Sequence, residues 1–115
     1  MQRKIEFRCW DKWTKQMLPV LSIDCKETYS SERGNIVLMQ YTGLKDKNGV
    51  EIYEGDIVTD GIINYVVAFY MGSWRLKRNI KGDTWWKSLY RYITNYKYKV
   101  IGNIYANPEL LKEGE

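Results

Sequence analysis

The 115-residue sequence has no histidine, two cysteines and two prolines. Histidine is the usual general base near neutral pH and the commonest side-chain ligand of transition metals, so its absence argues against many catalytic and metal sites. Cys9 would need a basic partner to act as a nucleophile, and its position among apolar residues favours a small core side chain instead. We therefore expect a protein that is not an enzyme and that holds no cofactor or metal.

The sequence also has no long apolar run. No window approaches the roughly 18 apolar residues of a membrane-spanning helix, and the basic residues Arg3 and Lys4 are not followed by the apolar stretch of a secretion signal. Two cysteines without such a signal are typical of free thiols in a reducing compartment. These absences predict a cytoplasmic protein that does not enter a membrane.

Aromatic residues are abundant, with ten tyrosines and five tryptophans against two phenylalanines. Amphipathic rings of this kind sit half-buried on sheet surfaces and at interfaces. A length of 115 residues is typical of one domain, and the few prolines argue against disorder. We therefore expect a single folded domain over residues 1–115.

Strict alternation near the N-terminus predicts a hairpin over about residues 3–22. Because Pro19 has no N–H to donate, the second strand is expected at a sheet edge or to end early. Residues 24–35 are polar and predict a loop. In the first strand, one set of side chains is expected inward and the other on a charged outer face: Ile5, Phe7 and Cys9 inward, and Lys4, Glu6, Arg8 and Trp10 outward.

Turn signals and apolar runs predict a barrel-like core over about residues 35–106. Asn48-Gly49 favours a type I′ hairpin turn, and further turns are expected at residues 54–56 and 60–61. The apolar runs predict a buried strand at 35–41, interrupted by Thr42-Gly43, a central strand at 62–70 and a closing strand at 96–105.

Two helices are expected. Asp83 and Thr84 are suitable caps, and apolar residues at helical spacing predict a helix over 84–94. Asn107-Pro108 is expected to start one helical turn in the tail, 107–115. The prediction is a mainly β (β-rich α+β) fold: a small, barrel-like, strongly curved antiparallel sheet with an N-terminal hairpin and one or two short helices.

Three blocks of the sequence carry a family resemblance. Residues 5–11 read Ile-Glu-Phe-Arg-Cys-Trp-Asp, and the other two blocks are 38–58 and 100–110. Together they resemble the YopX family of phage and prophage proteins, with Cys9 where that family usually has alanine. The resemblance implies a small β-rich protein in the cytoplasm of a bacterial host cell and is compatible with self-assembly. It carries no catalytic residue across.

Four acids lie within ten residues: Glu51, Glu54, Asp56 and Asp60. Paired carboxylates can serve acid–base chemistry or hold a divalent metal. Acids beside turn glycines are also common for local hydrogen bonding, and this interpretation is favoured. A calcium loop starting at Asp46 would need a bidentate acid at its twelfth position, where Ile57 stands.

The strongest functional signal is a basic, aromatic segment. Residues 72–99 contain eight bases and one acid, a net charge of +7, whereas the remainder carries −3. Three interpretations stay open: a solvated face, docking on the acidic remainder of another copy, or contact with nucleic acid. In the last case, the candidates are Arg75, Lys77, Arg78, Lys81, Lys87, Arg91, Lys97 and Lys99 for phosphates, and Trp85 and Tyr92 for stacking on bases.

The leading hypothesis is therefore a non-enzymatic phage or prophage accessory protein that acts as a binding or assembly module and forms homo-oligomers. The alternative is a nucleic-acid-binding protein of phage replication or regulation. A metal-dependent hydrolase or nuclease using the four acids is a distant third.

Overall fold

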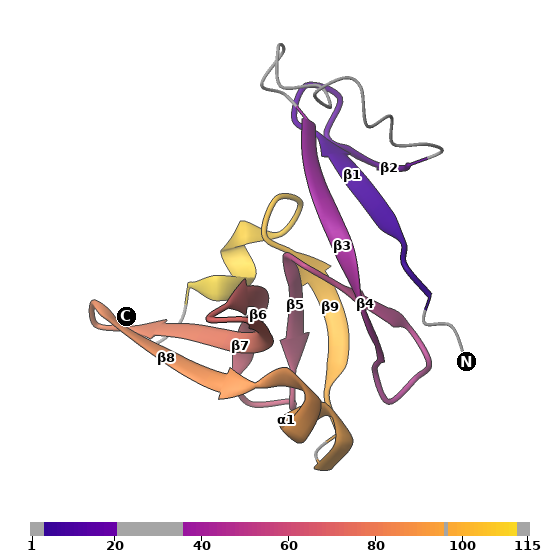
Figure 1. Ribbon diagram of the computed structural model, residues 1–115. Coiled ribbons are helices and arrows are strands. Elements are labelled where there is room, and N and C mark those ends of the chain that lie inside the picture. The colour runs from indigo at the N-terminus through magenta and orange to yellow at the C-terminus, as the bar shows by residue number, and fades with distance from the viewer. Residues whose placement is uncertain (1–3, 21–35, 96, 113–115) are drawn as a thin grey trace.

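Two antiparallel sheets make up the protein. The computed structural model describes residues 4–20, 36–95 and 97–112. The first sheet has strand order β2-β1-β3-β4 and the second has order β8-β7-β6-β5-β9 (Figure 1). The second sheet curls strongly into a half-barrel, so the predicted mainly β fold with a strongly curved antiparallel sheet is confirmed.

The first sheet contains the expected N-terminal hairpin. Its edge strand, β2, ends at Pro19, as the missing N–H predicts. The central strand β1 pairs with β3 on its other side. The loop predicted over 24–35 lies outside the described residues. The strands are β1 (Phe7–Asp11), β2 (Gln16–Pro19), β3 (Ile36–Lys45) and β4 (Glu51–Tyr53).

The predicted facing of β1 is wrong for Arg8 and Trp10. Trp10 is buried and its ring stacks on Tyr105, with 6.3 Å between the ring centroids. Arg8 reaches across to the second sheet, where it binds Asp56. The charged side chains of β1 predicted a solvent-facing side. That side instead meets the second sheet, where Asp56 neutralises the charge of Arg8.

β3 and its turn also differ from expectation. β3 is not interrupted at Thr42-Gly43; it continues through a bulge, where Gly43 adopts a φ of +88°. The following turn is not type I′, because Gly49 is left-handed but Asn48 is not. The Asp46 N–H donates to the Val50 carbonyl and the Gly49 N–H to the Asp46 carbonyl, which makes a three-residue loop with a bulge.

The second sheet has β6 at its centre, as predicted for residues 62–70. Two tight hairpins flank β7. Their loops are Met71-Gly72 and Lys81-Gly82, and both residues of each have positive φ, the signature of type I′ turns. The strands are β5 (Asp56–Thr59), β6 (Asn64–Tyr70), β7 (Ser73–Ile80), β8 (Asp83–Ser88) and β9 (Lys99–Asn103).

The helix predicted over 84–94 is wrong in its first half. Residues 83–88 form strand β8, and helix α1 covers Leu89–Asn95. The Lys81-Gly82 turn aligns β8 with β7 along six residue pairs, and this pairing overrides the helical spacing. The predicted turn in the tail is present as the 3-10 helix η1 (Pro108–Leu111), with Pro108 in its first turn. No helix in the described part of the chain is long and apolar enough to span a membrane.

The main core fills the concave side of the half-barrel, where α1 and β4 close it. Tyr65 and Tyr98 stack inside it with 5.9 Å between ring centroids. Leu44, Trp74 and Ile93 pack against its edges. The buried members are Ile52, Val58, Tyr65, Val67, Leu76, Leu89 and Tyr98.

Candidate functional site

The structure divides the basic segment between the two faces of the second sheet. Successive side chains of a strand point to opposite faces, so Arg75 and Lys77 lie on one face of β7 while Arg78 shares the other with buried Leu76. The +7 segment therefore does not form one continuous basic surface. Lys81 lies in the β7–β8 turn, Arg91 is exposed on α1, and Lys97 and Lys99 are exposed at the start of β9.

Two of the residues predicted to contact nucleic acid, Lys87 and Tyr92, lie next to each other in the structure. The Lys87 ammonium donates a hydrogen bond to the Tyr65 hydroxyl at 2.9 Å and lies 4.8 Å from the centroid of the Tyr92 ring. The bond to Tyr65 raises the pKa of Lys87. This contact ties β8 to β6 and α1, so Lys87 and Tyr92 take part in closing the half-barrel.

A second cluster lies on the opposite face and was missed by the sequence reasoning. Tyr70 and Trp86 stack nearly parallel, with 4.4 Å between centroids. Arg75 lies 5.8 Å from the Tyr70 ring and Lys77 lies 5.7 Å from the Trp86 ring. The two rings and the two cations therefore stabilise one another through stacking and cation–π contacts. Tyr70 and Trp86 come from strands separated by β7, and no pattern in a single sequence indicates a contact between such strands.

Two aromatic residues of the segment face solvent, Trp85 on β8 and Tyr90 on α1. The side chain of Trp85 is 58% exposed, and it lies directly opposite Arg78 in the β7–β8 register. No ring of the described residues stacks on it. Phe69, Tyr70 and Met71 are also exposed, at the neighbouring β6–β7 hairpin. We call β6, β7 and β8, with the turns between them, the β6–β8 arm.

Three of the four acids proposed as a third site are separated by their contacts. Glu51 pairs with Lys4 at 2.8 Å, and Asp60 accepts the Ile62 and Ile63 N–H groups in the β5–β6 turn. Asp56 is 1% exposed and pairs with Arg8. Within the described residues, no group of three or more metal-binding side chains could hold an ion.

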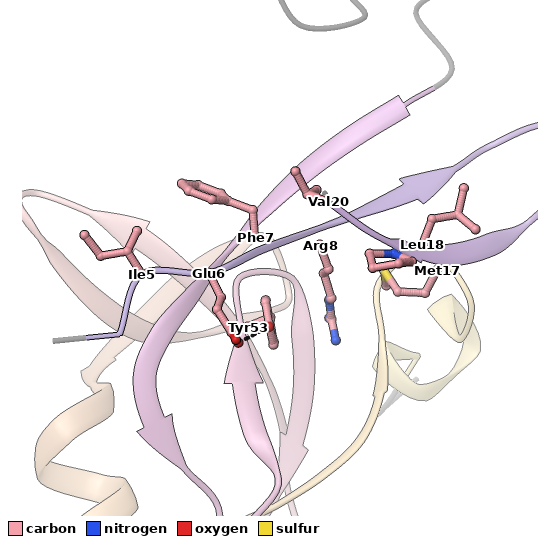
Figure 2. Close-up of a pocket in the computed structure, with 9 residues that line it drawn as sticks. Ile5, Glu6, Phe7, Arg8, Met17, Leu18, Val20 and Tyr53 are labelled. Carbon is pink, nitrogen blue, oxygen red and sulfur yellow. Dashed lines mark hydrogen bonds between the residues drawn. The ribbon is translucent and has the colours of Figure 1, made fainter. Parts of the chain in front are cut away.

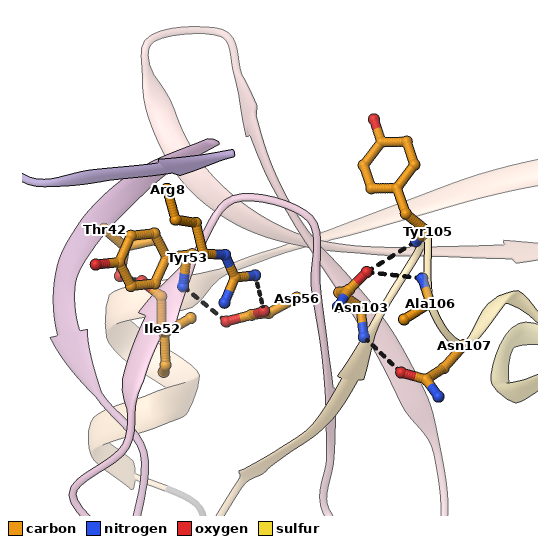
Figure 3. A network of polar contacts seen from close by, with 9 residues as sticks. All are labelled: Arg8, Thr42, Ile52, Tyr53, Asp56, Asn103, Tyr105, Ala106 and Asn107. Atoms are coloured by element: carbon orange, nitrogen blue, oxygen red, sulfur yellow. Dashed lines mark hydrogen bonds and ion pairs between the residues drawn. The ribbon is translucent and has the colours of Figure 1, made fainter. Parts of the chain in front are cut away.

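The contact between Arg8 and Asp56 joins the two sheets (Figure 3). One Asp56 oxygen binds Arg8, and the other accepts the Tyr53 N–H at 2.8 Å. The guanidinium also lies 4.5 Å from the Tyr53 ring centroid. Burial raises the pKa of Asp56, although the Arg8 charge and the Tyr53 N–H act in the opposite direction.

An open groove of about 580 Å³ lies beside this junction (Figure 2). Residues 5–8 and 17–20, from β1 and β2 and the positions next to them, line it together with Tyr53. Figure 2 shows Glu6 and Arg8 directed toward Tyr53, whereas Ile5 and Phe7 point to the other side of β1. The Tyr53 hydroxyl donates to Glu6 at 3.0 Å. Two polar groups of the groove thus bind one another, while Arg8 binds Asp56 and its Nε is buried without a hydrogen-bond partner among the described residues.

The C-terminal segment completes the junction. The Asn103 side chain accepts the Tyr105 and Ala106 N–H groups, and the Asn107 side chain accepts the Asn103 N–H (Figure 3). The Ile104 N–H donates to the carbonyl of Gly55 in the turn that links the sheets. All three sequence blocks, 5–11, 38–58 and 100–110, therefore meet where the two sheets join.

A protein-family model described as YopX protein matches residues 6–112. The chain belongs to the YopX family. Each of the three blocks that carry the YopX resemblance thus contributes residues that hold the two sheets together.

One solved structure similar to this YopX protein is described as the crystal structure of protein EF1440 from Enterococcus faecalis. The two share 28% sequence identity with a TM-score of 0.61, over 96% of this chain and 100% of that chain. No curated protein matches the chain.

Proposed function

We propose that this YopX protein is a non-enzymatic phage or prophage accessory module that acts by self-association in the cytoplasm of a bacterial host. The observation that carries the proposal is the exposed apolar surface of the β6–β8 arm. Trp85, Phe69 and Met71 are each more than half exposed there. Phe69 and Met71 lie at the β6–β7 turn and Trp85 lies near the β7–β8 turn, so the arm exposes apolar side chains at both ends. Exposed apolar surface is characteristic of protein–protein contacts.

The charge distribution supports a second copy as the partner. The arm and the segment that follows it carry the +7 charge, whereas the remainder of the chain carries −3. Complementary charges on copies of one chain favour their encounter and suppress wrong partners.

Sedimentation velocity over a wide range of protein concentrations tests this proposal. We expect species heavier than the 13.7 kDa chain, at a fraction that rises with concentration. Higher salt should weaken the association because part of it is electrostatic. A single 13.7 kDa species at the highest concentration reached would reject self-association.

A second candidate function, nucleic-acid binding, is favoured by the exposed ring of Trp85 with Arg78 opposite it. Exposed aromatic rings beside cations are stacking platforms for unpaired bases. The measurement is fluorescence anisotropy with a labelled single-stranded oligonucleotide at several salt concentrations. Trp85→Ser should weaken binding, and Trp13→Ser, which removes an exposed tryptophan from the β1–β2 turn, should not. Affinity that is independent of salt would reject this candidate.

A further inference from the structure

β8 is an edge strand with an unpaired side. β7 pairs with it along Asp83–Ser88, and no other described strand lies beyond it. Protected edges usually carry proline, a bulge or several charges. β8 has neither a proline nor a bulge; it carries one acid, one base and two adjacent tryptophans.

The two-residue turn determines which backbone groups point outward. In a hairpin of this kind the closing pair, Ile80 and Asp83, exchanges both hydrogen bonds, and the pattern then alternates along the strands. The N–H and C=O groups of Thr84, Trp86 and Ser88 therefore point away from β7. They form a row of donors and acceptors along the outer edge.

The side chains of β8 are self-complementary when two copies run antiparallel. Asp83, Trp85 and Lys87 alternate along the strand and so share one face. If the two-fold axis passes through Trp85, each Asp83 lies opposite Lys87 of the second copy and the two Trp85 rings meet on the axis. The outward-pointing groups of Thr84 then face those of Trp86 in the second copy.

We infer that two copies of this protein pair edge to edge through β8, antiparallel and centred on Trp85, which joins their five-stranded sheets into one continuous sheet. This inference rests on the proposed self-association and specifies its surface. The register has two hydrogen-bonded pairs, Thr84 with Trp86 and Trp86 with Thr84, and hence about four backbone hydrogen bonds. A shift of two residues in one direction places Trp85 opposite Lys87 and removes the ion pairs, so charge favours the register centred on Trp85.

Of the two charges at the ends of the register, Asp83 is available for this contact and Lys87 has partners within its own copy. Asp83 is exposed, and none of the ion pairs within the described residues includes it. Lys87 donates to Tyr65 and lies against the Tyr92 ring, so an ion pair with the Asp83 carboxylate of the second copy replaces these contacts when its side chain turns to the outer edge. Asp83 is also the single acid of the basic segment, and it stands where the second copy brings a lysine.

Two pairs of variants test the inference by sedimentation equilibrium. Thr84→Pro removes an outward N–H that β7 does not use, and Thr84→Val keeps that N–H while losing the same side-chain bond to Asn79. Asp83→Lys places like charges opposite each other, and Asp83→Asn only removes one charge. We expect the dissociation constant to rise at least about tenfold for Thr84→Pro and Asp83→Lys, and no more than about threefold for their controls.

The outcomes separate this inference from the proposed function. A monomeric parent protein overturns both. A parent that self-associates while Thr84→Pro and Asp83→Lys associate equally well overturns the β8 register alone. Circular dichroism checks that each variant is folded; if Thr84→Pro does not fold, the comparison of Asp83→Lys with Asp83→Asn decides, since Asp83 is exposed.

Discussion

Replacing Arg8 by methionine tests how strongly one ion pair holds the two sheets together. Methionine keeps much of the aliphatic stem but leaves the Asp56 carboxylate, which is 1% exposed, without its cation. Removing one partner of a buried ion pair costs about 3–5 kcal/mol. The Arg8 side chain is itself 20% exposed, so we expect the lower end, about 3 kcal/mol. Such a loss is a large part of the total stability of a small domain.

The loss should depend on pH in a defined direction. The pKa of Asp56 is already raised above its ordinary value of 3.8 by burial, and removing the Arg8 charge raises it further. Between the ordinary and the raised pKa, the folded state binds more protons than the unfolded state, so the free energy of unfolding falls as pH rises. The Arg8→Met variant should therefore lose most stability at neutral pH and less on acidification toward pH 4.

Urea titration followed by tryptophan fluorescence measures these free energies at several pH values. Arg8→Met combined with Asp56→Asn should recover part of the loss, because an uncharged side chain can still accept the Tyr53 N–H. Lys12→Met, which removes an exposed cation, should change stability by less than about 0.5 kcal/mol. A loss below about 1 kcal/mol for Arg8→Met, or a loss that does not change with pH, would refute the reasoning.

Three further predictions concern the junction and its neighbours. Asp46→Ala should cost about 2–4 kcal/mol in urea titrations, because this carboxylate accepts three backbone N–H groups, including that of Val100; faster hydrogen exchange at that amide is the accompanying readout. Gly102→Ala should cost about 1–3 kcal/mol by thermal unfolding, since its new Cβ would clash with the Asn107 Oδ1, and Asn107→Gly should relieve part of that loss. Burial raises the pKa of Tyr53 from 10.0 to about 12, so stability should fall as pH rises through this interval, and Tyr53→Phe should reduce the fall; an unchanged alkaline slope would contradict the prediction.

Local patterns in the sequence predicted most of the strands. Alternation identified β1 and the edge strand ending at Pro19, and the apolar run identified β6 as central. These features depend on neighbouring residues, so one sequence suffices to find them. β8 was missed because Lys81-Gly82 is a weaker turn signal than Asn-Gly, and because Trp86, Leu89 and Ile93 have helical spacing although a strand contributes the first of them.

The candidate site was less predictable than the fold. A run of bases in the sequence does not become a basic surface when its members alternate between the faces of one strand, as Arg75 and Arg78 do. The role of Arg8 depends on Asp56, 48 residues away, and no local pattern encodes such a pair. The family resemblance indicated the right residues, but their shared location at the junction required the structure.

The order of the strands has a consequence for how the chain folds. The described strands of the first sheet come from residues 7–53 and those of the second from 56–103, so each sheet is continuous in sequence and the strands pass from one sheet to the other once. The ion pair of Arg8 with Asp56 joins the two sheets, so it can form only when residues of both are present. The hydrogen bond from the Val100 N–H to Asp46 likewise requires a residue 54 positions later in the chain. Closing long loops is slow because its entropic cost precedes the contacts that offset it. We expect β1 and β3 to pair while a nascent chain still lacks β9 and the junction to close last; in pulsed hydrogen exchange, protection of Val100 before the β1–β3 amides would contradict this order.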